Sequence, residues 1–156
     1  MSLSYAASLD ICMRHADRLT WAMSQLSGKF PLSSDVIASL SDTELAVLDQ
    51  FSTRFAKLQD AMGAKLFPAV LELTKEQGSY PAFLDKLNRL EKIGAIESAD
   101  QWLTLREMRN EFSHDYPEDP ALQAAILNKA YLLASVLLEI LHKIASFGSN
   151  YAAAKR

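Results

Sequence analysis

The stretch YAASLDICMRHADRLTWAMSQL, residues 5–26, decides the fold class of this chain, because its apolar residues recur with the period of an α-helix. These residues alternate in steps of four and three and form one stripe: Tyr5, Leu9, Cys12, Ala16, Leu19, Met23 and Leu26. Gly28 and Pro31 follow the stripe, as expected where a helix ends. The N-terminal segment is therefore predicted to be one amphipathic helix that packs its stripe against the rest of the chain.

The same rhythm predicts a second, longer helix after a Ser-rich connector at residues 33–41. Ser41 and Glu44 have the spacing of a capping box, in which each side chain bonds the other residue's backbone amide. The apolar pattern then continues to Gly78. Pro68 lies inside it and should kink or break the helix, because proline lacks an amide donor. One long, bent helix is expected.

Three further helices complete the predicted order. A short one covers about residues 81–93 and stops at Gly94. The next covers about 98–115, and Ser98 and Gln101 form a second possible capping box at its start. The last is long, is capped by Asp119, and gives way to a polar tail from about Gly148. The sequence thus predicts one all-α domain over residues 1–156, an antiparallel up-down four-helix bundle with one additional short helix.

Composition limits the function classes. A single cysteine, Cys12, excludes an internal disulfide, and three histidines in all argue against a metal site. The net charge of −3 argues against broad attachment to nucleic acid, and no glycine loop suited to a cofactor's phosphates occurs. The longest apolar passage, residues 130–140, is too short to span a bilayer, and no targeting segment is evident. A cytoplasmic protein without membrane contact, metal or cofactor is expected.

The segment LREMRNEFSHDYP, residues 105–117, carries the candidate chemistry. A guanidinium such as that of Arg109 suits phosphate, and an imidazole such as that of His114 can move a proton near neutral pH. On a helical wheel, Arg106, Asn110 and His114 stack on the face opposite the apolar residues, and Arg109 falls at the border. Such a polar row is often only a solvated helix face, so the wheel alone leaves a structural and a catalytic reading open.

The order Arg109-Asn110, three residues, His114, one residue, Tyr116 lies near the end of the penultimate helix of a small all-α chain. In this setting it resembles the HEPN superfamily, and more narrowly the HEPN toxins encoded beside minimal nucleotidyltransferases. The resemblance implies a metal-independent endoribonuclease that serves as the toxin of a toxin–antitoxin pair. It also implies a homodimer whose motif helices face each other and form one composite cleft, with a separate nucleotidyltransferase as antitoxin.

The resemblance also implies a role for each residue. His114 would act as general acid or base, Arg109 would stabilise charge on the phosphoryl oxygens, and Asn110 would orient the scissile phosphate or hold the histidine. Tyr116 would flank the site and accept AMP from the partner enzyme. Arg106 is a candidate contact for RNA or nucleotide, which would offset the acidic residues around the pair: Glu107, Glu111, Asp115, Glu118 and Asp119.

Two other hypotheses remain open from the sequence. Related HEPN bundles serve as non-catalytic substrate-binding partners of a separate nucleotidyltransferase, and such a subunit would assemble with its enzyme whether or not His114 is present. A structural helical dimer would be indifferent to both Arg109 and His114, apart from stability.

Overall fold

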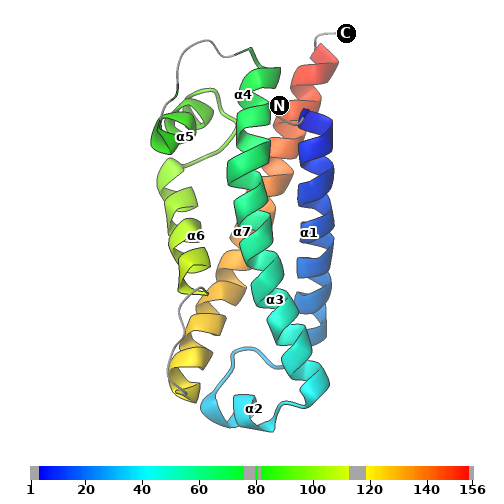
Figure 1. Cartoon of the computed structure of the whole chain (residues 1–156), viewed down its shortest axis with the longest axis vertical. Coiled ribbons are helices and arrows are strands. Elements are labelled where there is room, and N and C mark those ends of the chain that lie inside the picture. The colour runs from blue at the N-terminus through cyan, green and yellow to red at the C-terminus, as the bar shows by residue number, and fades with distance from the viewer. Residues whose placement is uncertain (1–3, 76–79, 81, 113–118, 155–156) are drawn as a thin grey trace.

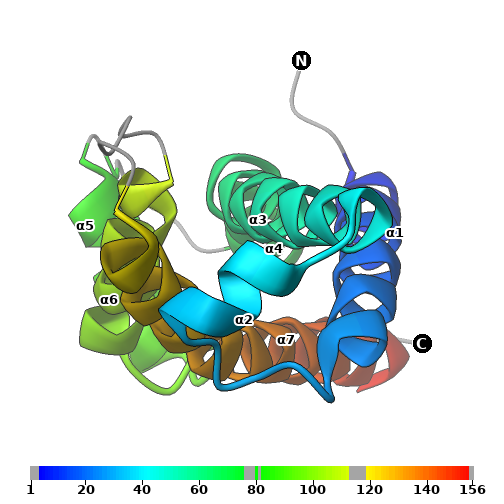
Figure 2. The ribbon, with the colours of Figure 1, turned by 90° about the horizontal axis from the view of Figure 1, so that it is seen from below.

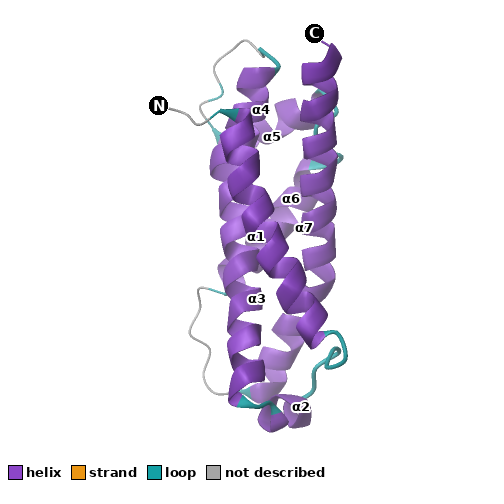
Figure 3. Cartoon of the chain, turned by 90° about the vertical axis from the view of Figure 1, so that its right-hand side faces the viewer, coloured by secondary structure: helices purple, strands orange, loops and turns teal. Residues whose placement is uncertain are grey.

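In the computed structural model, every element of secondary structure among the described residues is a helix, so the predicted all-α class is confirmed. The structure describes residues 4–75, 80, 82–112 and 119–154. Long helices extend along the longest axis of the molecule, and shorter ones lie near its ends (Figure 1 and Figure 3). The long helices are α1 (Tyr5–Leu26), α3 (Asp42–Ala61), α6 (Ala99–Glu111) and α7 (Pro120–Ala154).

Helix α1 has the boundaries that its apolar stripe predicts. Ser4 caps it by accepting a hydrogen bond of 3.1 Å from the amide of Ala7. Most of the stripe is buried, including Cys12 and Leu19, neither of which exposes any surface. The helix packs mainly against α3 and also contacts α7. Burial raises the pKa of the Cys12 thiol to about 12, so Cys12 is a core residue, as predicted, and not a nucleophile.

The segment predicted as a connector contains a short helix, α2 (Ser34–Ser39), and that part of the prediction was wrong. Ser33 caps α2 by accepting from the amide of Val36 at 3.2 Å. A helix of 6 residues is too short to show an apolar period, which explains the error. Seen from below, α2 lies across the end of the molecule (Figure 2). Asn128 of α7 secures the preceding loop, because its amide bonds both backbone groups of Leu32, at 2.6 and 2.9 Å.

The long central segment stays helical through Pro68, but with a change of pitch. Helix α3 begins with the predicted capping box between Ser41 and Glu44, with bonds of 3.0 and 3.1 Å. It continues into a π-helical turn, η1 (Met62–Leu66), and then into α4 (Phe67–Leu73). In the turn, the amide of Phe67 bonds the carbonyl of Met62, five residues back. Pro68 therefore falls in the first turn of α4, where its missing amide costs little.

Helix α5 (Phe83–Lys92) ends just before Gly94, the residue predicted to stop it, and Gly94 adopts a φ of 84° that favours glycine. The expected capping box at the start of α6 forms only in part. Ser98 accepts from the amide of Gln101 at 3.1 Å, but Glu91 of α5 takes the amide of Ala99 at 2.7 Å. A carboxylate from another helix thus helps to cap α6.

Helix α7 begins as predicted, with Asp119 accepting from the amide of Leu122 at 3.2 Å. It ends later than predicted, because residues 148–154 continue the helix and do not form a polar tail. Packing explains the difference. Gly148 is buried against Tyr5, and the Tyr5 hydroxyl donates to the carbonyl of Ala145 at 3.0 Å. The hydroxyl of Tyr151 donates to the carbonyl of Thr74 at 3.3 Å, which holds the last turns on α4.

By length and composition, α7 is also a helix that could cross a membrane. Its most apolar 18-residue window has a mean hydropathy of 1.7, and 33% of that window is buried. Residues 130–140, which the sequence indicated as too short to span a bilayer, are only part of this helix. Core helices of soluble proteins have the same composition, and Ala130, Ala134, Leu137, Leu141 and Ile144 all lie in the core. The absence of membrane contact therefore stays a prediction.

Candidate functional site

The faces of α6 agree with the helical wheel. Trp102, Leu105 and Met108 are buried on the core side, while Arg106 and Asn110 are exposed. Arg109 lies between the two sides and is half-buried. Phe112, which follows the helix, packs its ring edge-on against Phe55 at 5.5 Å between centroids. Two of the three residues proposed for catalysis, Arg109 and Asn110, are thus placed by the structure.

His114 and Tyr116 lie outside the described residues. Their segment follows directly after Phe112 and is succeeded by Asp119, the cap of α7. Among the described residues, the candidate site comprises Arg109, Arg106 and the residues that these two contact.

The Arg109 guanidinium forms a bidentate ion pair with Asp60 of α3. Its Nε and Nη2 atoms each donate to a different carboxylate oxygen of Asp60, both at 2.9 Å. These hydrogen bonds raise the pKa of the Arg109 guanidinium, so the side chain stays charged and its fork has a fixed plane. The side chains keep 30% and 51% of their surface exposed, for Arg109 and Asp60 respectively. The pair is thus a surface feature that links α6 to α3.

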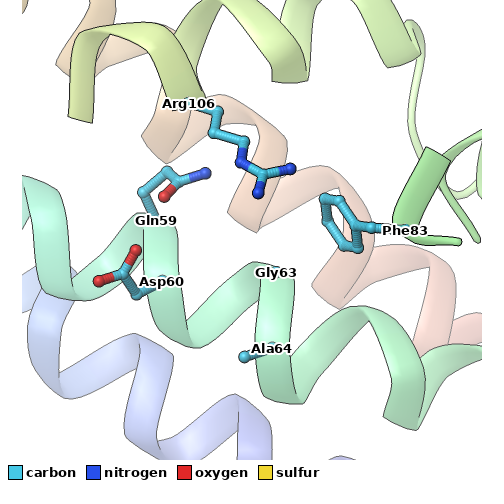
Figure 4. Close-up of a pocket in the computed structure, with 6 residues that line it drawn as sticks. All are labelled: Gln59, Asp60, Gly63, Ala64, Phe83 and Arg106. Atoms are coloured by element: carbon cyan, nitrogen blue, oxygen red, sulfur yellow. The ribbon is translucent and has the colours of Figure 1, made fainter. Parts of the chain in front are cut away.

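A cavity of about 280 Å³ adjoins this pair. Residues of α3, the π-turn, α5 and α6 line it: Gln59, Asp60, Gly63, Ala64, Phe83 and Arg106 (Figure 4). The Arg106 guanidinium reaches into it and lies over the Phe83 ring, 5.4 Å from the centroid. Asp60 both lines the cavity and holds Arg109. Arg106 therefore lies in the cavity with an aromatic ring beside it, and Arg109 is linked to the cavity wall through Asp60.

The floor of the cavity depends on the π-turn. This turn places Gly63 and Ala64, neither of which has a long side chain, at the cavity wall. A Cβ atom on Gly63 would lie 3.4 Å from Cζ2 of Trp102 and 3.5 Å from Cζ of Phe83. Single π-turns within α-helices are frequent at functional sites. Here the turn contributes Gly63 and Ala64 to the cavity wall, and the buried Trp102 lies next to Gly63.

Gln59 contributes a polar group from the buried side. Only 4% of its surface is exposed, and its side-chain amide points toward Arg106 (Figure 4). Within the part of the chain that the structure describes, this amide makes no hydrogen bond, although it borders the cavity. Although the residue is mostly buried, its amide atoms are not among the fully buried side-chain atoms that lack a partner, so they face the open cavity and can bond water or a ligand there.

A second polar cluster lies between α1 and α3. Nη1 of Arg54 lies 2.9 Å from Nδ1 of His15. Burial, and then the positive charges of Arg54, Lys57 and Lys65, lower the pKa of His15. A neutral imidazole that accepts from Arg54 fits this environment, so His15 serves to join two helices. The described residues include no group of three or more His, Cys, Asp or Glu side chains that could hold a metal ion.

Sequence reasoning missed Asp60, Gln59 and Phe83. Asp60 and Arg109 are 49 positions apart, and an isolated aspartate on a predicted helix carries no signal of its own. Gln59 stands at the edge of the apolar pattern of α3, where a glutamine usually faces solvent. Only the packing of α3 and α5 against α6 brings these side chains together.

Comparison with known proteins identifies no family for this chain: no family model, curated protein or solved structure matches it.

Proposed function

We propose that this chain is a metal-independent endoribonuclease that acts as the toxin of a toxin–antitoxin pair. The Arg109–Asp60 ion pair beside the Arg106 cavity is the observation that carries the proposal. One guanidinium in an open cavity and a second one bonded to its wall suit an RNA backbone better than they suit an ordinary solvated helix face. The antiparallel arrangement of four long helices with short helices between them, which the HEPN resemblance implies, belongs to the same proposal.

The proposed reaction needs no metal. The ribose 2′-hydroxyl attacks the neighbouring phosphorus, the bond from phosphorus to the 5′-oxygen breaks, and a 2′,3′-cyclic phosphate and a 5′-hydroxyl result. His114 takes the proton from the 2′-hydroxyl or supplies one to the leaving oxygen. Arg109 donates hydrogen bonds to the phosphoryl oxygens as negative charge builds on them. Asn110 orients the phosphate or the histidine, and Tyr116 flanks the cleft.

The cleft is proposed to form between two copies of the chain. On one protomer, Arg106 and Asn110 are exposed on the outer face of α6, so a second copy that covers this face would enclose them. Enclosure strengthens each charge interaction by excluding water. The proposed antitoxin is a separate nucleotidyltransferase that transfers AMP to Tyr116.

In this proposal Asp60 positions Arg109. An exposed ion pair of this kind contributes only about 0–1 kcal/mol to stability, so an incoming phosphate can share the guanidinium at little cost. We expect Asp60→Asn to lower the rate constant of RNA cleavage about tenfold, because an amide cannot accept both hydrogen bonds of the fork. The substrate concentration for half-maximal rate should change less. Single-turnover cleavage of a labelled RNA measures the rate constant. The dependence of that rate on enzyme concentration gives the concentration for half-maximal rate.

Asp10→Asn is the matched control, because Asp10 pairs with Arg14 on the exposed face of α1, away from α6. This control should leave cleavage unchanged. Equal rates for the Asp60→Asn variant and the wild type would remove the positioning role. A faster variant would show that Asp60 competes with phosphate for Arg109.

The second candidate function is a non-catalytic partner subunit of a nucleotidyltransferase. One observation favours it: Asp60 already occupies both donors at one edge of the Arg109 fork. An arginine whose positive charge is already balanced by a carboxylate suits a structural or docking role. This candidate predicts stable assembly with the separate enzyme, no RNA cleavage and no inhibition of growth on expression. Growth arrest that disappears with His114→Ala would decide against it.

A further inference from the structure

We propose that the cavity between α3, the π-turn, α5 and α6 binds one nucleobase of the RNA, next to the phosphate held by Arg109. This inference rests on the proposed function and adds a base-binding subsite to it. The subsite comprises Gln59, Gly63, Phe83 and Arg106.

The size of the cavity fits a single planar ring system. Pockets for drug-sized ligands measure roughly 300–1,000 Å³, and this cavity, at about 280 Å³, lies just below that range. Gly63 contributes no side chain to its wall, and a Cβ there would make ordinary contacts with Trp102 and Phe83. A base can therefore enter, whereas a larger ligand would have to extend out of the opening.

The walls offer the two kinds of surface on which bases stack. Phe83 supplies an aromatic face, and the planar guanidinium of Arg106 lies over that ring at 5.4 Å. Proteins that bind single-stranded RNA stack unpaired bases on aromatic rings and on arginine planes. Arg106 is also exposed at the opening, so it can turn toward the backbone when a base takes its place against Phe83.

Gln59 supplies the hydrogen bonds. Its amide borders the cavity and makes no hydrogen bond with any described residue. The residue as a whole exposes only 4% of its surface. A side-chain amide has two donor hydrogens and one acceptor oxygen, which match the alternating donors and acceptors along a base edge. A phosphate would use only the donors, whereas a base edge uses both kinds of group. The amide therefore favours a base over a phosphate, and the aromatic and guanidinium surfaces favour a base over a ribose.

The position of Asp60 connects the subsite to the proposed chemistry. Asp60 lines the cavity and at the same time holds Arg109 at 2.9 Å. A base in the cavity thus places its own backbone beside the Arg109 fork. The RNA must be unpaired at this point, since a paired base could not enter.

Trp102 provides a signal for binding. It is fully buried beneath Gly63, whereas the other tryptophan, Trp21, is 46% exposed. In a Trp21→Phe background, Trp102 is the sole tryptophan, and its fluorescence can be followed during titration with each of the four nucleoside 5′-monophosphates. Ribose 5-phosphate and inorganic phosphate serve as ligands that lack the base.

We expect saturable quenching by at least one nucleotide and none by ribose 5-phosphate or inorganic phosphate. Leucine has nearly the same volume as glutamine, so Gln59→Leu removes the hydrogen bonds and keeps the packing. This variant should raise the dissociation constant of the nucleotide at least tenfold. Gln123→Leu is the matched control and should change nothing, since Gln123 lines a different cavity, between α3 and α7. Equal binding of ribose 5-phosphate, or unchanged binding by the Gln59→Leu variant, would overturn the subsite.

Cleavage assays separate this inference from the function on which it rests. If RNA is cleaved and Gln59→Leu cleaves all sequences as the wild type does, the subsite is wrong and the ribonuclease proposal stands. If nucleotides bind through Gln59 but no RNA is cleaved, the subsite stands and the chain is a binding subunit.

Discussion

Replacing Arg109 with alanine is expected to lower the rate of RNA cleavage by about 10²–10³-fold while the chain stays folded. The loss follows from removing the hydrogen bonds that stabilise charge on the phosphoryl oxygens. Stability should hardly change, because the Arg109–Asp60 pair is partly exposed and contributes about 0–1 kcal/mol. Single-turnover cleavage together with thermal unfolding of the same sample measures both effects.

Arg14→Ala is the matched control for this variant. Arg14 also pairs with an aspartate, Asp10, but on the exposed face of α1. Its loss should leave the cleavage rate unchanged. Arg109→Lys should recover only part of the activity, because an ammonium keeps the charge without the planar fork. Full activity in Arg109→Ala would exclude the α6 face as the catalytic site.

The largest effect on stability is expected for Trp102→Ala, which should lower the free energy of unfolding by about 3–5 kcal/mol. Trp102 exposes no surface, its ring packs on Phe67 with centroids 4.5 Å apart, and it supports the floor of the cavity at Gly63. Truncation would leave a void that joins the cavity above it. Urea unfolding followed by circular dichroism measures the change.

Two substitutions test the reason for this effect. Trp21→Ala removes the same side chain from a position that is 46% exposed. It should lower the free energy of unfolding much less than Trp102→Ala does. Trp102→Phe should also cost less than Trp102→Ala, because the buried indole N–H makes no hydrogen bond in the structure and phenylalanine keeps most of the ring packing. A similar loss for Trp21→Ala and Trp102→Ala would show that the core does not lie where the structure places it.

The sequence predicted those parts of the fold that depend on local signals. The stripe of α1, the Ser41–Glu44 capping box, the stop at Gly94 and the Asp119 cap each depend on residues within a few positions. Helix α2 was missed because it is too short for a period. The continuation of α7 beyond Gly148 was missed because it depends on Tyr5, at the other end of the chain.

The candidate site was predictable only on α6. The wheel placed Arg106 and Asn110 outward and Arg109 at the border, as the structure has them. The partners of these residues could not be foreseen. Which residues of α3 face α6 is decided by packing between segments far apart in the sequence, and His114 and Tyr116 lie outside the described residues.

The measurement that tests the central claim most directly is an analysis of RNA ends after incubation with the purified chain in excess EDTA. The account predicts fragments with 2′,3′-cyclic phosphate and 5′-hydroxyl ends from the wild type and the Arg14→Ala variant, and intact RNA from the Arg109→Ala and His114→Ala variants. Cleavage that requires a divalent metal, fragments with 5′-phosphate ends, or intact RNA with the wild type under all conditions would contradict it.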